Sequence, residues 1–157
     1  GVMRGGDPVA GAVYAPVVGD MYSAAAGRGA FLDDRPIGVS GSDELATALL
    51  ATGFSYHIGG ERERQARRIA RILPRVRDVR RSGSAAIDLA TVAAGRVDGY
   101  FEAFINSWDV VAGVLLVREA GGTVTSFDGS ALDLEAPAGV IASSPALHDE
   151  IAELVQD

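Results

Sequence analysis

The chain has 157 residues and a formal net charge of −7, and its sequence contains no cysteine and no lysine. The lack of cysteine excludes disulfide frameworks, thiolate metal sites and cysteine nucleophiles, and the lack of lysine excludes Schiff-base and Walker-lysine chemistry. The acidic balance argues against a nucleic-acid partner, and no apolar run reaches the length of a membrane span or forms a signal peptide. We therefore expect a cytoplasmic protein with neither a nucleic-acid nor a membrane partner.

The first residues, Gly1-Val2-Met3-Arg4-Gly5-Gly6, lead directly into a strand pattern and do not resemble a natural start. We therefore expect the chain to be a fragment. Residues 9–40 contain β-type runs separated by turn signals at 16–20, 27–29 and 33–36, which predict antiparallel hairpins. Residues 1–41 are accordingly predicted to form part of a β-sheet.

From residue 42 onward, predicted strands alternate with predicted helices. The strands are expected at 45–52, 76–80, 97–102, 123–127 and 139–143, and the helices at 61–73, 85–94, 110–120 and 145–155. This alternation predicts a layered α/β domain over residues 42–157. The arginine-rich part of the helix at 61–73 is predicted to face water, and both histidines, His57 and His148, are predicted at the surface.

Three strand-to-helix junctions are the candidate places for chemistry, because ligands of α/β sheets collect there. Residues 80–86 place glycine and small residues at a helix start, which suits an anion or a hydroxyl, although a plain helix cap explains them equally. Glu102 ends a strand and is either a hydroxyl acceptor or an exposed acid. Asp109 precedes an apolar helix, where it is either an N-cap residue or a metal ligand.

In their order and spacing these junctions resemble the inositol monophosphatase family. The segments that carry the resemblance are Gly83-Ser84-Ala85-Ala86-Ile87-Asp88, residues 95–102, Trp108-Asp109-Val110-Val111-Ala112-Gly113 and Glu119-Ala120-Gly121-Gly122, with upstream matches at 11–16, 19–24 and 27–31. The resemblance covers essentially the whole chain, and the Trp-Asp run followed by Glu-Ala-Gly-Gly is its most specific part. Val111 departs from the family, which commonly has alanine there.

The resemblance implies the C-terminal part of an αβαβα sandwich, in which a mixed sheet flanked by helices follows strands of a second, antiparallel sheet. It implies a Mg²⁺-dependent phosphomonoesterase that hydrolyses inositol monophosphate or a similar small phosphate ester, and that forms a homodimer. By position, Asp109 would bind the catalytic metal, and Glu102 would contact inositol hydroxyls. The remaining matches are substrate contacts at Gly83, Ser84 and Ala85 and a supporting ion pair of Arg80 with Asp98. Apart from the resemblance, we interpret Trp108 as a packing anchor for the Asp109 loop and not as a stacking platform.

The family's other metal ligands, an upstream Glu and an Asp-Pro-x-Asp-Gly-Thr motif, would lie before residue 1. The segment 7–11 begins with a similar Asp7-Pro8 pair, but Ala10 and Ala12 stand where the motif requires Asp and Thr. We therefore reject it as a metal site and interpret Asp7 as a turn residue. A single carboxylate cannot hold a centre of several magnesium ions, so we expect the chain by itself to be inactive.

Other functions stay open at this point. Within the family, the substrate can be histidinol phosphate, fructose 1,6-bisphosphate or a 3′-phosphonucleotide, although Glu102 and residues 83–86 favour inositol phosphate. Outside catalysis, the chain can be a truncated module that binds a partner. An unrelated α/β scaffold would require the ordered motifs to be a coincidence.

Overall fold

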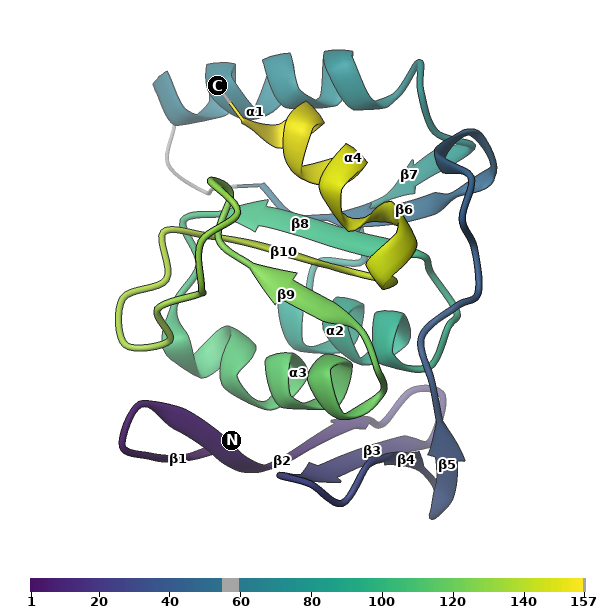
Figure 1. Cartoon of the computed structure of the whole chain (residues 1–157), viewed down its shortest axis with the longest axis vertical. Coiled ribbons are helices and arrows are strands. Elements are labelled where there is room, and N and C mark those ends of the chain that lie inside the picture. The colour runs from purple at the N-terminus through teal and green to yellow at the C-terminus, as the bar shows by residue number, and fades with distance from the viewer. Residues whose placement is uncertain (55–59, 157) are drawn as a thin grey trace.

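The computed structural model describes residues 1–54 and 60–156, and this part of the chain forms two five-stranded sheets and four α-helices (Figure 1). The first sheet is antiparallel throughout and keeps chain order. Its strands are β1 (Val2–Arg4), β2 (Asp7–Ala15), β3 (Asp20–Ala25), β4 (Ala30–Leu32) and β5 (Arg35–Ile37). Asp7 is the exposed first residue of β2 and not part of the preceding turn. His57, which the sequence predicts at the surface, lies outside the described residues.

The second sheet is mixed, with the order β7-β6-β8-β10-β9. Its strands are β6 (Leu49–Thr52), β7 (Asp78–Arg80), β8 (Gly99–Ala103), β9 (Thr123–Thr125) and β10 (Gly139–Ser143). β6 runs parallel to both β7 and β8, whereas β10 runs antiparallel to β8 and β9. The strand predicted at 45–52 is shorter than expected because Leu45–Thr47 forms a 3₁₀ turn, and the strand predicted at 76–80 begins at Asp78.

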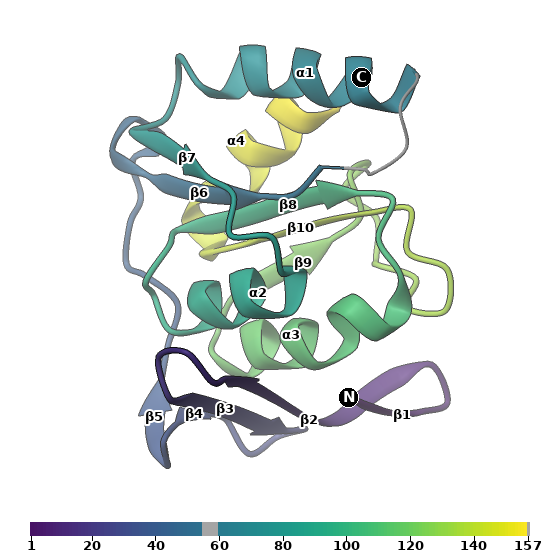
Figure 2. The ribbon, with the colours of Figure 1, turned by 180° about the vertical axis from the view of Figure 1, so that it is seen from behind.

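The helices and sheets alternate in four layers. The helices are α1 (Gly60–Ile72), α2 (Ala85–Ala93), α3 (Ser107–Glu119) and α4 (Pro145–Val155). Figures 1 and 2 show α1 and α4 on one face of the second sheet, α2 and α3 on its other face, and the first sheet beyond α2 and α3. This arrangement confirms the mixed sheet flanked by helices and the separate antiparallel sheet. In the part of the chain that the structure describes, no helix is long and apolar enough to cross a membrane.

Helix α3 is the central element of the packing, because it lies between α2 and the first sheet. Its buried side chains lie on several sides, as expected for a helix enclosed on more than one face. Small residues allow the close approach: a Cβ at Gly113 would lie 2.5 Å from the Leu89 Cβ, and one at Gly11 would lie 2.9 Å from the Ala112 Cα. The position of α3 is therefore determined by steric fit on two sides.

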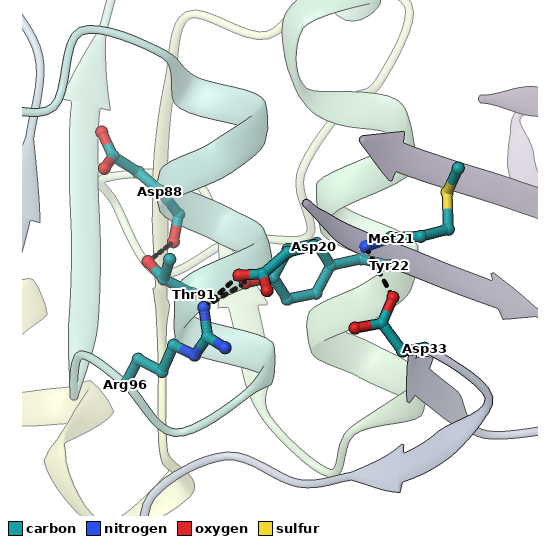
Figure 3. A network of polar contacts seen from close by, with 7 residues as sticks. All are labelled: Asp20, Met21, Tyr22, Asp33, Asp88, Thr91 and Arg96. Atoms are coloured by element: carbon teal, nitrogen blue, oxygen red, sulfur yellow. Dashed lines mark hydrogen bonds and ion pairs between the residues drawn. The ribbon is translucent and has the colours of Figure 1, made fainter. Parts of the chain in front are cut away.

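A polar cluster ties the first sheet to the segment after α2 (Figure 3). The buried Tyr22 hydroxyl on β3 donates to Asp20 Oδ2 at 3.0 Å. Arg96 donates from Nη1 to the Tyr22 hydroxyl at 2.9 Å and forms an ion pair with Asp20. Burial and the Asp20 bond raise the pKa of Tyr22 to about 12. The layers are thus joined by directional contacts as well as by apolar packing.

Two predictions of surface position are wrong. Arg68 on α1 is buried, since its Nε donates to the Val155 carbonyl at 2.7 Å and its guanidinium lies 4.8 Å from the centre of the Phe127 ring. His148 is also buried, because the inner face of α4 packs against the second sheet. Its ring nitrogens contact the Ser143 and Thr125 hydroxyls at 3.1 and 2.8 Å, and burial lowers its pKa. In both cases a neighbouring element covers a polar side chain and supplies its partners.

Candidate functional site

The three junctions meet at one cavity. β6, β7 and β8 are parallel, so their carboxyl ends lie at the same edge of the sheet, where ligands of such sheets bind. A cavity of about 390 Å³ opens at this edge. The side chains that line it come from the segments after these strands and from the starts of α2 and α3: Gly53, Phe54, Arg81, Gly83, Ser84, Ala85, Ala86, Glu102, Phe104, Ile105, Asn106, Trp108 and Asp109.

The start of α2 forms one wall of this cavity. Ser84 is the N-cap residue, and its Oγ accepts from the Ile87 N–H at 3.4 Å. Ser82 supports the turn, because its Oγ accepts from the Ser84 N–H at 3.3 Å. Gly83 has φ 95°, a left-handed conformation that favours glycine. The N-terminus of α2 therefore presents backbone N–H groups and the positive end of the helix dipole to the cavity, which suits an anionic ligand.

Glu102 lies on β8 and is held by two contacts. The Tyr100 hydroxyl donates to Glu102 Oε2 at 2.5 Å. A Cβ built at Gly53 would lie 2.1 Å from the Glu102 carboxyl carbon, so any other residue at this position would force the carboxyl group to shift. Burial raises the pKa of Glu102, the Tyr100 bond lowers it, and the nearby charge of Asp109 raises it further. Sequence reasoning assigned no role to Tyr100, although it stands in the motif at 95–102, and missed Gly53, which lies outside the motifs.

Asp109 lies in the first turn of α3, but it is not the N-cap residue. That residue is Asn106, whose backbone N–H donates to Asp109 Oδ2 at 3.2 Å and whose side-chain amide donates to the same oxygen at 3.4 Å. Asp109 is therefore the third residue of a capping arrangement, with a carboxylate that closes the helix end and lines the cavity. The prediction that Asp109 is the N-cap residue is therefore wrong, and its role as a metal ligand stays a prediction.

Asp88 is an acidic residue on α2 to which sequence reasoning assigned no role. It lies on the side of α2 that points away from the Asp20–Tyr22–Arg96 cluster (Figure 3), and it is only 4% exposed. Its Oδ2 has no hydrogen-bond partner among the described residues. Burial raises its pKa to about 6, the charge of Glu102 adds to this effect, and Ser82 and Arg81 oppose it. A rise of this kind is typical of carboxyl groups beside functional sites, although burial alone can produce it.

The predicted supporting roles of Arg80, Asp98 and Trp108 are wrong in their details. Arg80 forms its ion pair with Asp78, two residues away on the same strand, whereas Asp98 Oδ2 accepts from the Leu49 N–H at 2.7 Å. Asp98 therefore supports the sheet and does not pair with Arg80. Trp108 is 81% exposed at the cavity and packs against little of the described structure, so it is not a packing anchor for the Asp109 loop.

The described residues at the cavity fit the requirements of a magnesium site only in part. Mg²⁺ is commonly held by one or two carboxylates together with phosphate oxygens and water. Asp109 offers one such carboxylate beside the anion-favouring start of α2. No group of three or more His, Asp or Glu side chains that could hold a metal ion occurs among residues 1–54 and 60–156. A centre of several ions would need further ligands from outside this set.

The whole chain, residues 1–157, matches the family model of the inositol monophosphatase family. The chain belongs to this family. It is 42% identical over 146 residues to the inositol-1-monophosphatase of Synechocystis, covering 93% of this chain and 50% of that protein. It is 43% identical over 129 residues to the protein named Nus factor SuhB of Xylella fastidiosa, covering 82% of this chain and 47% of that protein.

Among solved structures, the inositol monophosphatase of Anabaena (Nostoc) superposes with a TM-score of 0.88 at 41% identity, covering 99% of this chain and 64% of that one. The fold predicted from the motifs is therefore confirmed. The chain spans about half the length of the curated relatives it matches. The relatives are named as enzymes in one case and as a Nus factor in the other, so membership of the family alone does not define what this chain does.

Proposed function

We propose that this chain forms the substrate-binding part of a Mg²⁺-dependent phosphomonoesterase, which hydrolyses inositol monophosphate or a similar small phosphate ester to an alcohol and phosphate. The observation that carries the proposal is the single cavity that joins Asp109, Glu102 and the start of α2. Those are the positions at which the family resemblance implies a metal ligand, a hydroxyl acceptor and a substrate contact.

Each part of the cavity has a chemical role in this proposal. The N–H groups at the start of α2, from Gly83 to Ala85, bind the negatively charged substrate. The Glu102 carboxylate accepts a hydrogen bond from a substrate hydroxyl and so orients the ring. Asp109 provides one metal ligand. Magnesium, when bound, polarises the phosphate, activates a water molecule and stabilises the leaving oxygen.

Phosphate release from inositol 1-phosphate tests the proposal, with and without Mg²⁺. We expect the 157-residue chain alone to be inactive, and a polypeptide that also carries the Asp-Pro-x-Asp-Gly-Thr segment to be active. In that longer polypeptide, Asp109→Asn is expected to abolish Mg²⁺-dependent turnover. Full turnover that survives Asp109→Asn would refute the metal role. Turnover of inositol 1-phosphate no faster than that of histidinol phosphate would remove the substrate preference.

A non-catalytic role is the second candidate. It is favoured by the lack, among the described residues, of a group of three or more side chains that could hold a metal ion, and by the name of the Xylella relative, a Nus factor. If the coding sequence before Gly1 contains no Asp-Pro-x-Asp-Gly-Thr motif, this candidate becomes the stronger one. Under either function we propose a cytoplasmic homodimer, which sedimentation and cell fractionation can test.

A further inference from the structure

Tyr100 lies on β8 two residues before Glu102, within the motif at 95–102, and none of the proposed roles uses it. We propose that Tyr100 is a positioning residue whose hydroxyl holds the Glu102 carboxylate in place for a substrate hydroxyl, and that it thereby sets the preference for polyol phosphates. This inference rests on the proposed function of Glu102 as the hydroxyl acceptor. It concerns how that carboxylate is oriented and which substrates benefit.

The geometry of β8 brings the two side chains together. Residues two apart on a strand point to the same face, so Tyr100 and Glu102 both point to the α2 side of the sheet. Tyr100 has no exposed surface, and its hydroxyl reaches Glu102 Oε2 at 2.5 Å. A phenol has one hydrogen to donate. This bond therefore uses one acceptor position of Oε2, and the carboxylate keeps further acceptor positions, including those of Oε1, for a substrate hydroxyl.

Glu102 also packs closely against Gly53. The Cβ that any other residue would place there comes within 2.2 Å of both Glu102 oxygens. The carboxyl group therefore contacts both the backbone of Gly53 and the hydroxyl of Tyr100. A glutamate side chain loses considerable rotational freedom when it is fixed, and here that loss occurs on folding and not on substrate binding. The site is thus preorganised for the hydroxyl.

The phenol is suited to act as a permanent donor. Burial and the adjacent Glu102 charge raise the pKa of Tyr100 well above its usual range, so its hydroxyl stays protonated. Asp88 also acts on this phenol electrostatically and is a competing acceptor in the same region. The bond is formed to Glu102, while Asp88 Oδ2 has no partner among the described residues. Tyr100 therefore supports the acid that faces the cavity.

The kinetic test uses Tyr100→Phe in the active longer polypeptide with two substrates. Inositol 1-phosphate has hydroxyls beside the phosphate, and p-nitrophenyl phosphate has none. We expect kcat/KM for inositol 1-phosphate to fall about tenfold, mainly through KM, because a site built around a hydroxyl loses its oriented acceptor. We expect p-nitrophenyl phosphate to change less than about twofold. Tyr14→Phe removes a hydroxyl from an exposed tyrosine on the first sheet and is the matched control.

The outcomes separate this inference from the proposed function. Equal losses for both substrates would indicate a merely structural role and overturn the inference, as would no loss for either. Glu102→Gln is the reference: if it abolishes the preference but Tyr100→Phe does not, the role of Tyr100 is refuted while that of Glu102 stands. If Glu102→Gln leaves the preference unchanged, the proposed role of Glu102 fails.

A spectroscopic test on the 157-residue chain needs no activity. The buried hydroxyl bonded to Glu102 is expected to give a downfield, slowly exchanging proton resonance. That resonance should vanish in Tyr100→Phe, shift in Glu102→Gln and persist in Tyr14→Phe. If no resonance that responds to both Tyr100→Phe and Glu102→Gln is found in a folded sample, the Tyr100–Glu102 bond is absent and the inference is overturned.

Discussion

Replacing Asp88 by asparagine is expected to stabilise the protein at neutral pH. Asp88 is 4% exposed, and its Oδ2 lacks a partner among the described residues. Burial disfavours the charged form and raises the pKa from 3.8 to about 6. The folded chain therefore holds this proton more tightly than the unfolded chain, so the free energy of unfolding decreases as pH rises from about 4 to about 6.

The interval between these pKa values corresponds to about 3 kcal/mol, at about 1.4 kcal/mol for each pH unit. Above pH 6 the carboxylate is ionised in both states, and the full cost of burying its charge is present. Asparagine removes that charge but brings a buried amide that needs partners, which offsets part of the gain. We therefore expect Asp88→Asn to raise the free energy of unfolding by about 2 kcal/mol at pH 7 and to lower it by about 1 kcal/mol below pH 4, where only the cost of the buried amide remains.

Urea denaturation at several pH values between 3.5 and 7.5 measures this difference directly. The comparison of variant with parent cancels the contributions of the other acids. Asp43→Asn, at an exposed position, is the matched control and should change stability by less than about 0.5 kcal/mol at every pH. A difference between Asp88→Asn and the parent that does not vary with pH, or a variant less stable at pH 7, would contradict the reasoning.

Three further predictions concern Gly53, Glu119 and Arg96. In the active longer polypeptide, Gly53→Ala should displace the Glu102 carboxyl and lower kcat/KM for inositol 1-phosphate at least tenfold (on the order of 1.4 kcal/mol), while circular dichroism shows that the fold is retained. Glu119→Gln should destabilise the chain by about 1 kcal/mol at pH 7, because its carboxylate accepts from two backbone N–H groups after β3 and its pKa is lowered. This loss should fade as pH falls below about 4.5, and a constant loss in denaturant titrations would contradict it. Arg96→Met should break the ion pair with Asp20 and increase amide hydrogen exchange in β3, whereas unchanged exchange there would show that apolar packing alone holds the sheet.

Much of the local structure could be predicted from short stretches of the sequence. Gly121 and Gly122 mark the end of α3, Ser144 and Pro145 mark the start of α4, and alternating strands and helices indicate the second sheet. These signals are local, because capping groups and turn residues act within a few positions. The errors at Leu45–Thr47 and before Asp78 are boundary errors, where apolar residues continue past the paired part of a strand.

The sequence by itself determined the family, the order of the junctions and the residues Asp109, Glu102 and Gly83 to Ala85 as one candidate site. Only the tertiary structure decided what surrounds them. The burial of Asp88 and His148, the exposure of Trp108 and the partner of Asp98 depend on which distant element covers each side chain. The packing of Glu102 against Gly53 also depends on a distant part of the chain. Gly53 lies about fifty residues before Glu102 and is brought close to it by the parallel pairing of β6 and β8. The periodicity of apolar residues identifies which face of a helix or strand is buried. The contacts between elements are made only when the layers pack together.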